Sequence, residues 1–103
     1  MLYCVIGKPK ENRVLPRHEE FLRLVEREWE MVIDWQGRGK INECFGFADG
    51  SGGIIILDAD SQREVEMKVE ELPLYPHADW EIKELMTADH GLNSVRKKLD
   101  SLK

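Results

Sequence analysis

The sequence has no long hydrophobic run, and its first residues carry no basic start. A bilayer-spanning helix needs about 18 or more apolar residues, whereas the apolar run at residues 54–57 is four residues long. The first residues, Met1 to Lys8, pass directly into a strand-like run without a basic start or a small-residue cleavage site. We therefore expect a cytoplasmic protein that does not enter a membrane.

Cysteine and histidine are scarce. The sequence has 2 cysteines and 3 histidines, and they share none of the short spacings that metal sites use. Cys4 and Cys44 both lie in apolar stretches, which is typical of buried, reduced thiols. We expect neither a metal site nor a disulfide.

Positive charge is in the minority. Lys and Arg number 15 against 20 Asp and Glu, so the net charge is −5, which is opposite in sign to what phosphate neutralisation requires. The glycine-rich segment at residues 50–53 precedes a strand pattern, so its amides lack the helix N-terminus that binds phosphate. The sequence predicts no nucleic-acid partner and no phosphate-binding loop.

The composition is that of one ordered domain. With 42% apolar and 34% charged residues, a chain of this length can bury enough side chains to form a core. Periodic patterns predict, in order, strand, helix, strand, strand, helix and strand. They cover residues 1–7, 16–36, 41–48, 53–58, 61–72 and 80–85. This order is that of the ferredoxin-like α+β fold, an antiparallel sheet with both helices on one face.

The third predicted strand is apolar on both of its sides. Residues 54–57 do not alternate with polar residues, and the first strand is similarly apolar. Because the helices cover only one face of the sheet, the other face needs a cover. A second copy of the sheet, packed face to face, would bury this apolar surface. The sequence therefore predicts a dimeric α+β barrel or a higher homo-oligomer.

The end of the chain forms a separate unit. From Leu92 to Lys103 a helical apolar stripe carries a charge of +3, from four Lys or Arg and one Asp. A helix of this length is marginal in water unless it docks, and the acidic segment Glu64–Glu71 suits it by charge. We expect an α+β domain at residues 1–88 and a helical tail at residues 89–103 that contacts its own or a neighbouring subunit.

Two side chains suit proton transfer. Strand parity places Glu43 among apolar neighbours, which raise the pKa of a carboxyl toward the range of a general base; the alternative is an edge-strand glutamate that reaches water. His77 lies at the entrance to the last strand, where it either lines a pocket or is an exposed loop histidine. Tyr3 and Tyr75 could donate hydrogen bonds to a substrate, although tyrosines at such positions usually belong to the core.

One segment resembles a known family. The second predicted helix ends in a Leu-Pro-Leu-aromatic-Pro element at residues 72–76, with acids at positions 79 and 81. This element, the hairpin and the capped helix resemble the muconolactone isomerase family over residues 37–86, whereas residues 1–36 match in pattern only. The resemblance implies a ferredoxin-like subunit, obligate oligomers up to decamers and a C-terminal segment that reaches a neighbouring subunit.

The same resemblance implies an enzyme that moves a proton within an unsaturated lactone carrying a carboxylate, without metal or organic cofactor. Such a reaction needs a proton-transferring group and a cation for the carboxylate. The family tends to carry basic and aromatic residues on the second strand, whereas residues 40–45 here are Lys-Ile-Asn-Glu-Cys-Phe. The cation is therefore missing or supplied by Lys40 or Arg38.

We accordingly predict a cofactor-independent isomerase of a small unsaturated or lactone carboxylic acid. The predicted catalytic residues are Glu43 and His77, and the predicted substrate-binding residues are Tyr3, Lys40 and Tyr75. Two alternatives stay open on the same scaffold. One is a non-catalytic oligomeric module for ligand binding or interaction, and the other is a cofactor-independent barrel monooxygenase.

Overall fold

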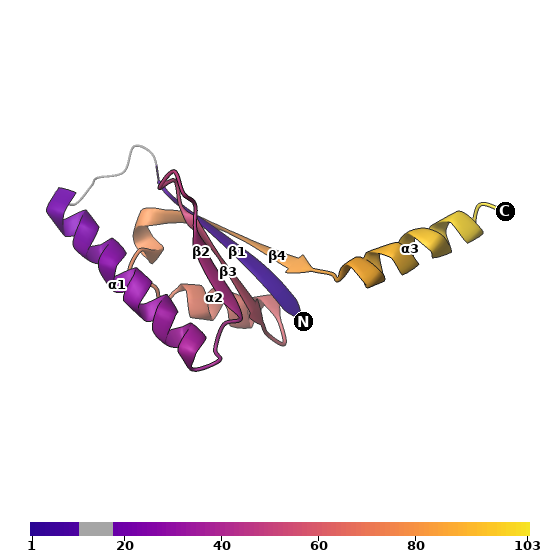
Figure 1. Ribbon diagram of the computed structural model, residues 1–103, viewed down its shortest axis with the longest axis horizontal. Helices are drawn as coiled ribbons and strands as arrows, with labels where there is room; N and C mark the ends of the chain where they lie inside the picture. Colours follow the sequence, from indigo (N-terminus) through magenta and orange to yellow (C-terminus); the bar gives the residue numbers. More distant parts are fainter. Residues whose placement is uncertain (11–17) are drawn as a thin grey trace.

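The computed structural model describes residues 1–10 and 18–103, which form one antiparallel sheet and three α-helices (Figure 1). The sheet has the order β2-β3-β1-β4, and every pair of neighbours is antiparallel. This arrangement confirms the ferredoxin-like α+β fold. Along the chain the elements are β1 (Leu2–Pro9), α1 (His18–Gly37), β2 (Glu43–Gly46), β3 (Gly53–Asp58), α2 (Gln62–Val69), the 3₁₀ turn η1 (Tyr75–His77), β4 (Ala78–Leu85) and α3 (Ala88–Asp100).

The core lies between the sheet and the helices α1 and α2. From the sheet, β1 contributes Tyr3 and Val5 and β3 contributes Leu57, all of them buried. The helices contribute buried side chains to the same cluster, among them Trp35 from α1 and Val65 from α2. Burying such apolar side chains stabilises the fold by about 1.5–3 kcal/mol each. One face of the sheet therefore carries the whole core.

The helix α2 begins with the capping box that its sequence predicts. The Ser61 hydroxyl accepts a hydrogen bond from Glu64 N at 3.2 Å, and the Glu64 carboxylate accepts one from Asp60 N at 2.9 Å. The helix ends at Val69, earlier than expected, because the next backbone bonds tighten: Leu72 N donates to Val69 O, three residues back. Pro73 then follows without a backbone N–H.

The strands differ from the predicted ranges mainly at β2. β3 spans residues 53–58 as predicted, but β2 covers only residues 43–46 of the predicted 41–48. Ile41 is buried outside the strand, and Phe47 N donates to Gly52 O inside the hairpin loop, so side-chain burial and turn geometry shorten the ladder at both ends. The predicted start of the first helix at Pro16 lies outside the described residues.

The other face of the sheet has no helix over it within residues 1–10 and 18–103 (Figure 1). The register places Cys4 beside Ile56 and Ile6 beside Ile54 on this face. Phe45, opposite Ile54, is 54% exposed. We call these five side chains the open face. Cys44 lies on the helix side, so the two cysteines point to opposite faces, and both are free and half-buried rather than fully buried.

The helix α3 extends away from the rest of the chain (Figure 1). It starts four residues before the predicted Leu92, because the Thr87 hydroxyl caps it by accepting a hydrogen bond from His90 N at 3.1 Å. None of its side chains is buried. No helix in the described part of the chain is long and apolar enough to span a membrane.

Candidate active site

Three glycines stand side by side across the sheet on the side of α1. The register pairs Gly46 with Gly53, Gly53 with Gly7, and Gly7 with Trp80. A row without side chains leaves room above the sheet, and aromatic rings occupy its two ends. A Cβ added at Gly46 would lie 2.7 Å from the Trp29 ring, and one added at Gly7 would collide with the Trp80 ring. The glycines therefore let both indoles lie against the backbone.

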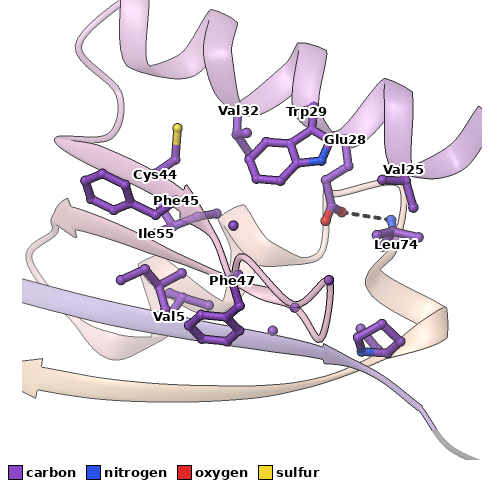
Figure 2. Close-up of a pocket in the computed structure, with 18 of the residues that line it drawn as sticks. Val5, Val25, Glu28, Trp29, Val32, Cys44, Phe45, Phe47, Ile55 and Leu74 are labelled. Carbon is purple, nitrogen blue, oxygen red and sulfur yellow. Dashed lines mark hydrogen bonds between the residues drawn. The ribbon is translucent and has the colours of Figure 1, made fainter. Parts of the chain in front are cut away.

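A cavity of about 310 Å³ lies above this glycine row, between the sheet and α1 (Figure 2). That volume is at the lower end of the range for small-molecule sites. Its floor includes Val5 and Ile55, and Val25 and Val32 come from α1. Aromatic residues make up much of the wall: Phe21, Trp29, Phe47 and Trp80.

Glu28 brings a carboxyl group into this apolar wall. It projects from α1 toward residue 74, where its Oε1 accepts a hydrogen bond from Leu74 N at 3.0 Å (Figure 2). Burial raises the pKa of the Glu28 carboxyl, and the bond from Leu74 N lowers it by less. A carboxyl with a raised pKa, inside a cavity, is suited to acid–base chemistry.

Glu28 is not among the residues predicted from the sequence, although the sequence carries a signal for it. Phe21, Val25, Val32 and Trp35 recur at steps of three, four and seven along the predicted helix, and position 28 falls in the same stripe. A charged residue at such a position is rarely buried without a partner. The interrupted stripe could therefore have pointed to a functional carboxyl.

His77 also lines the cavity, as expected for one of its two alternatives. It is half-buried at the end of η1, where its N–H donates to Leu74 O at 2.9 Å and its carbonyl accepts from Lys10 N at 3.0 Å. These backbone bonds fix the turn that also holds the partner of Glu28. The cavity thus receives one acid from α1 and one imidazole from η1.

Glu43 does not lie in the cavity, contrary to the prediction that it is a catalytic residue among apolar neighbours. It is exposed on β2, opposite Ile56 on the open side of the sheet, and it is not among the residues that line the cavity. Its Oε2 accepts a long hydrogen bond, 3.4 Å, from Gln36 Nε2. Strand parity correctly places Glu43 with Phe45, but that side faces away from the helices. The neighbouring Cys44 lines the cavity instead, and burial followed by the charge of Glu43 raises the pKa of its thiol.

The structure does not bring the three predicted substrate-binding residues together. Tyr3 is 3% exposed in the core, where burial and then Glu84 and Glu64 raise its pKa. Lys40 is exposed beyond α1, and its carbonyl accepts from Lys68 Nζ at 3.3 Å. Tyr75 borders a second, more polar hollow, formed with Gln62, Glu66 and Trp80 among others. Among the described residues, no three His, Cys, Asp or Glu side chains could hold a metal ion.

The fold and the cavity define a ferredoxin-like protein with a site for a small ligand between sheet and helix. The chain belongs to the muconolactone delta-isomerase family, whose sequence profile matches residues 1–90. Among solved structures, a muconolactone isomerase superimposes with a TM-score of 0.67 at 22% identity, covering 84% of this chain and 90% of that one.

A second similar structure is the 5-chloro-2-hydroxyhydroquinone dehydrochlorinase of Burkholderia phenoliruptrix, in complex with 2,5-dihydroxybenzoquinone. It has a TM-score of 0.60 at 17% identity and covers 87% of this chain and 98% of that one. At these identities both likenesses show the fold alone. No curated protein sequence matches the chain.

Proposed function

We propose that this protein is a cofactor-independent enzyme of the isomerase type, which moves a proton within a small unsaturated ring or lactone compound. The observation that carries the proposal is the position of Glu28, a carboxyl group of raised pKa in the wall of an apolar cavity. Family membership supports the same class of reaction. A volume of about 310 Å³ accommodates a single substituted ring.

The proposed reaction needs only groups that the chain supplies. The Glu28 carboxylate removes a proton from a carbon next to the substrate carbonyl, and the bonding electrons move into an enolate. A proton then returns to a different carbon of the same conjugated system, so the product is an isomer and no electrons are lost or gained. His77, the second titratable group that lines the cavity from a different element, donates a hydrogen bond to the enolate oxygen or returns the proton.

A matched pair of variants on α1 tests the role of Glu28. Glu28→Gln keeps an oxygen that can accept from Leu74 N but cannot move a proton, whereas Glu30→Gln changes an exposed glutamate two residues away. We expect Glu28→Gln to lower kcat for isomerisation of an unsaturated lactone, whether carboxylated or uncharged, by about 10²-fold to 10⁴-fold. Glu30→Gln should leave kcat unchanged.

Two further variants separate the candidate residues. His77→Asn should lower kcat by a smaller factor than Glu28→Gln, because it retains a hydrogen-bond donor. If Glu43→Gln abolishes turnover while Glu28→Gln does not, the predicted role of Glu43 stands and the proposed role of Glu28 is wrong. The absence of turnover with both carboxylated and uncharged unsaturated lactones would reject the isomerase and favour the non-catalytic module.

We also propose that the protein acts as a homo-oligomer. The open face gathers Cys4, Ile6, Ile54, Ile56 and Phe45 without a covering element in the described part of the chain. Monomeric proteins seldom expose so continuous an apolar patch. A second sheet packed against it would bury these side chains.

A further inference from the structure

We infer that the cavity selects a flat, uncharged ring compound, such as a quinol, a quinone or a lactone that lacks a free carboxylate. This inference rests on the proposed function of the same cavity, and it names the shape and the charge of the substrate. It differs from the sequence-based expectation, which is a carboxylic acid held by Lys40.

The shape of the cavity favours a planar ligand. Its floor combines Val5 and Ile55 with the row of three paired glycines, where the pleated surface carries no side chains. The Trp29 and Trp80 rings lie against two of these glycines and form walls at opposite ends of the row. A flat ring can stack on an indole, and Gly53, which lies between the two glycines that the indoles cover, adds no side chain beneath it.

The charges around the cavity disfavour an anion. Within the described residues, its lining contains no Lys or Arg, and the titratable groups are Glu28 from α1, Cys44 from β2 and His77 from η1. A carboxylate placed here would lose its hydration without gaining a salt bridge. It would also share the cavity with the Glu28 carboxyl, whose ionised form repels it.

Lys40, the cation predicted from the sequence, does not supply the missing positive charge in the cavity. It follows the C-terminal end of α1, is exposed and does not line the cavity. The polar groups that do line the cavity are instead suited to neutral oxygens. The Glu28 carboxyl can accept a hydrogen bond from a hydroxyl, or donate one to a carbonyl when it is protonated, and an imidazole can donate to or accept from a hydroxyl.

Two commercial probes that differ only by a carboxylate test the inference. Hydroquinone is uncharged at pH 8, and 2,5-dihydroxybenzoate is the same ring with one carboxylate. Isothermal titration calorimetry of the protein at pH 8 gives Kd for each. We expect hydroquinone to bind at least 10-fold more tightly.

The variants Glu28→Gln and Glu30→Gln then show whether charge in the cavity causes the preference. Removing the ionisable group at position 28 should improve binding of the benzoate and so reduce the ratio of the two Kd values severalfold. Glu30→Gln, on the exposed side of the same helix, should leave the ratio unchanged.

Several results would overturn the inference. These are equal or tighter binding of 2,5-dihydroxybenzoate, a ratio that Glu28→Gln does not alter, or no binding of hydroquinone at millimolar concentration. The proposed function fails separately. If the protein binds hydroquinone selectively but isomerises nothing, the inferred ligand class stands and the proposed enzymatic activity is wrong. If it isomerises only carboxylated lactones, the proposed activity stands and the inferred ligand class is wrong.

Discussion

The two faces of the sheet are built from the same strands and serve opposite purposes. On the helix side, Gly7, Gly46 and Gly53 align across three strands and leave a cavity under α1. On the other side, Ile54 and Ile56 align with the side chains of β1 and form a continuous apolar surface. The helix-side face leaves room for a ligand where three glycines carry no side chains. The open face instead exposes a continuous set of apolar side chains.

The period of two along a strand makes this division possible. In β3, Ile55 and Leu57 point to the helices, while Ile54 and Ile56 point to the open face. A strand with four consecutive large aliphatic residues therefore supplies both the core and the open face. Neighbouring positions in the sequence should respond differently to the same substitution.

The largest expected difference is between Ile55→Asp and Ile56→Asp. Ile55 packs against the core and lines the cavity, so a carboxylate there would be buried without a partner and should cost more than about 4 kcal/mol, enough to unfold a small domain. Ile56→Asp places the charge on the open face and should dissociate the oligomer while leaving each protomer folded. Circular dichroism and light scattering at the same concentration measure the two effects.

Light scattering of the wild type gives the control for this pair. A wild-type mass of 12.0 kDa at micromolar concentration, with intact circular dichroism, would contradict the proposed oligomer. If Ile56→Asp unfolds the chain as completely as Ile55→Asp, the two faces are not separable in the way that the register implies.

The next largest effect is expected from the glycine row. Gly46→Ala puts a Cβ at 2.7 Å from the Trp29 ring, which must move out of its place, at a cost of about 1–3 kcal/mol. Gly37→Ala is the matched control, because nothing lies within 4 Å of its added Cβ, and it should be neutral or stabilising by up to about 1 kcal/mol. Urea unfolding measures both, and equal effects would contradict the role of the row.

The fold was largely predictable because each of its elements carries a local signal. Ser61 and Glu64 mark a helix start, and the glycine-rich segment 49–53 marks a hairpin. The ends of β2 were not predictable in the same way, because Ile41 is buried in the core cluster without pairing in the strand ladder. Long-range packing decided those ends.

The candidate site was less accessible to sequence reasoning. Parity correctly separated Glu43 from Cys44, but it could not say which side of β2 would face α1. Glu28 escaped notice because its partner, Leu74 N, lies 46 residues away and is a backbone group without a sequence signature. His77 could be predicted from the sequence because it lies directly before the last strand, and its side chain lines the cavity there.

A smaller effect is expected from pH on the stability of Glu28→Gln. The folded pKa of Glu28 is raised above its ordinary value of 4.5, so the unfolded state ionises first and the wild type loses stability as pH rises through this range. Below pH about 4 the Glu28 carboxyl is mostly protonated in both the folded and the unfolded state, so the wild type and Glu28→Gln should have the same melting temperature. Toward pH 7 the variant should melt higher, by a few degrees.

Thermal melts at several pH values, with Glu30→Gln as the matched control, measure this gap. The exposed control should follow the wild type within about 0.5 kcal/mol throughout. A melting temperature of Glu28→Gln that falls relative to that of the wild type as pH rises would have the wrong sign for a carboxyl with a raised pKa. It would mean that the bond from Leu74 N outweighs burial at this site.

The smallest effect on the protein as a whole is expected at α3, which belongs to neither face. Thr87→Ala removes the hydroxyl that accepts from His90 N, and losing such a cap costs a helix about 1 kcal/mol. Because a helix of 13 residues is marginal on its own and none of its side chains is buried here, the ellipticity at 222 nm should fall. The main melting transition should stay within about 1 °C of the wild type, since the core contains nothing from α3. A melting temperature several degrees lower would instead mean that α3 packs against a subunit of the oligomer. Part of the stability of the assembly would then depend on this contact.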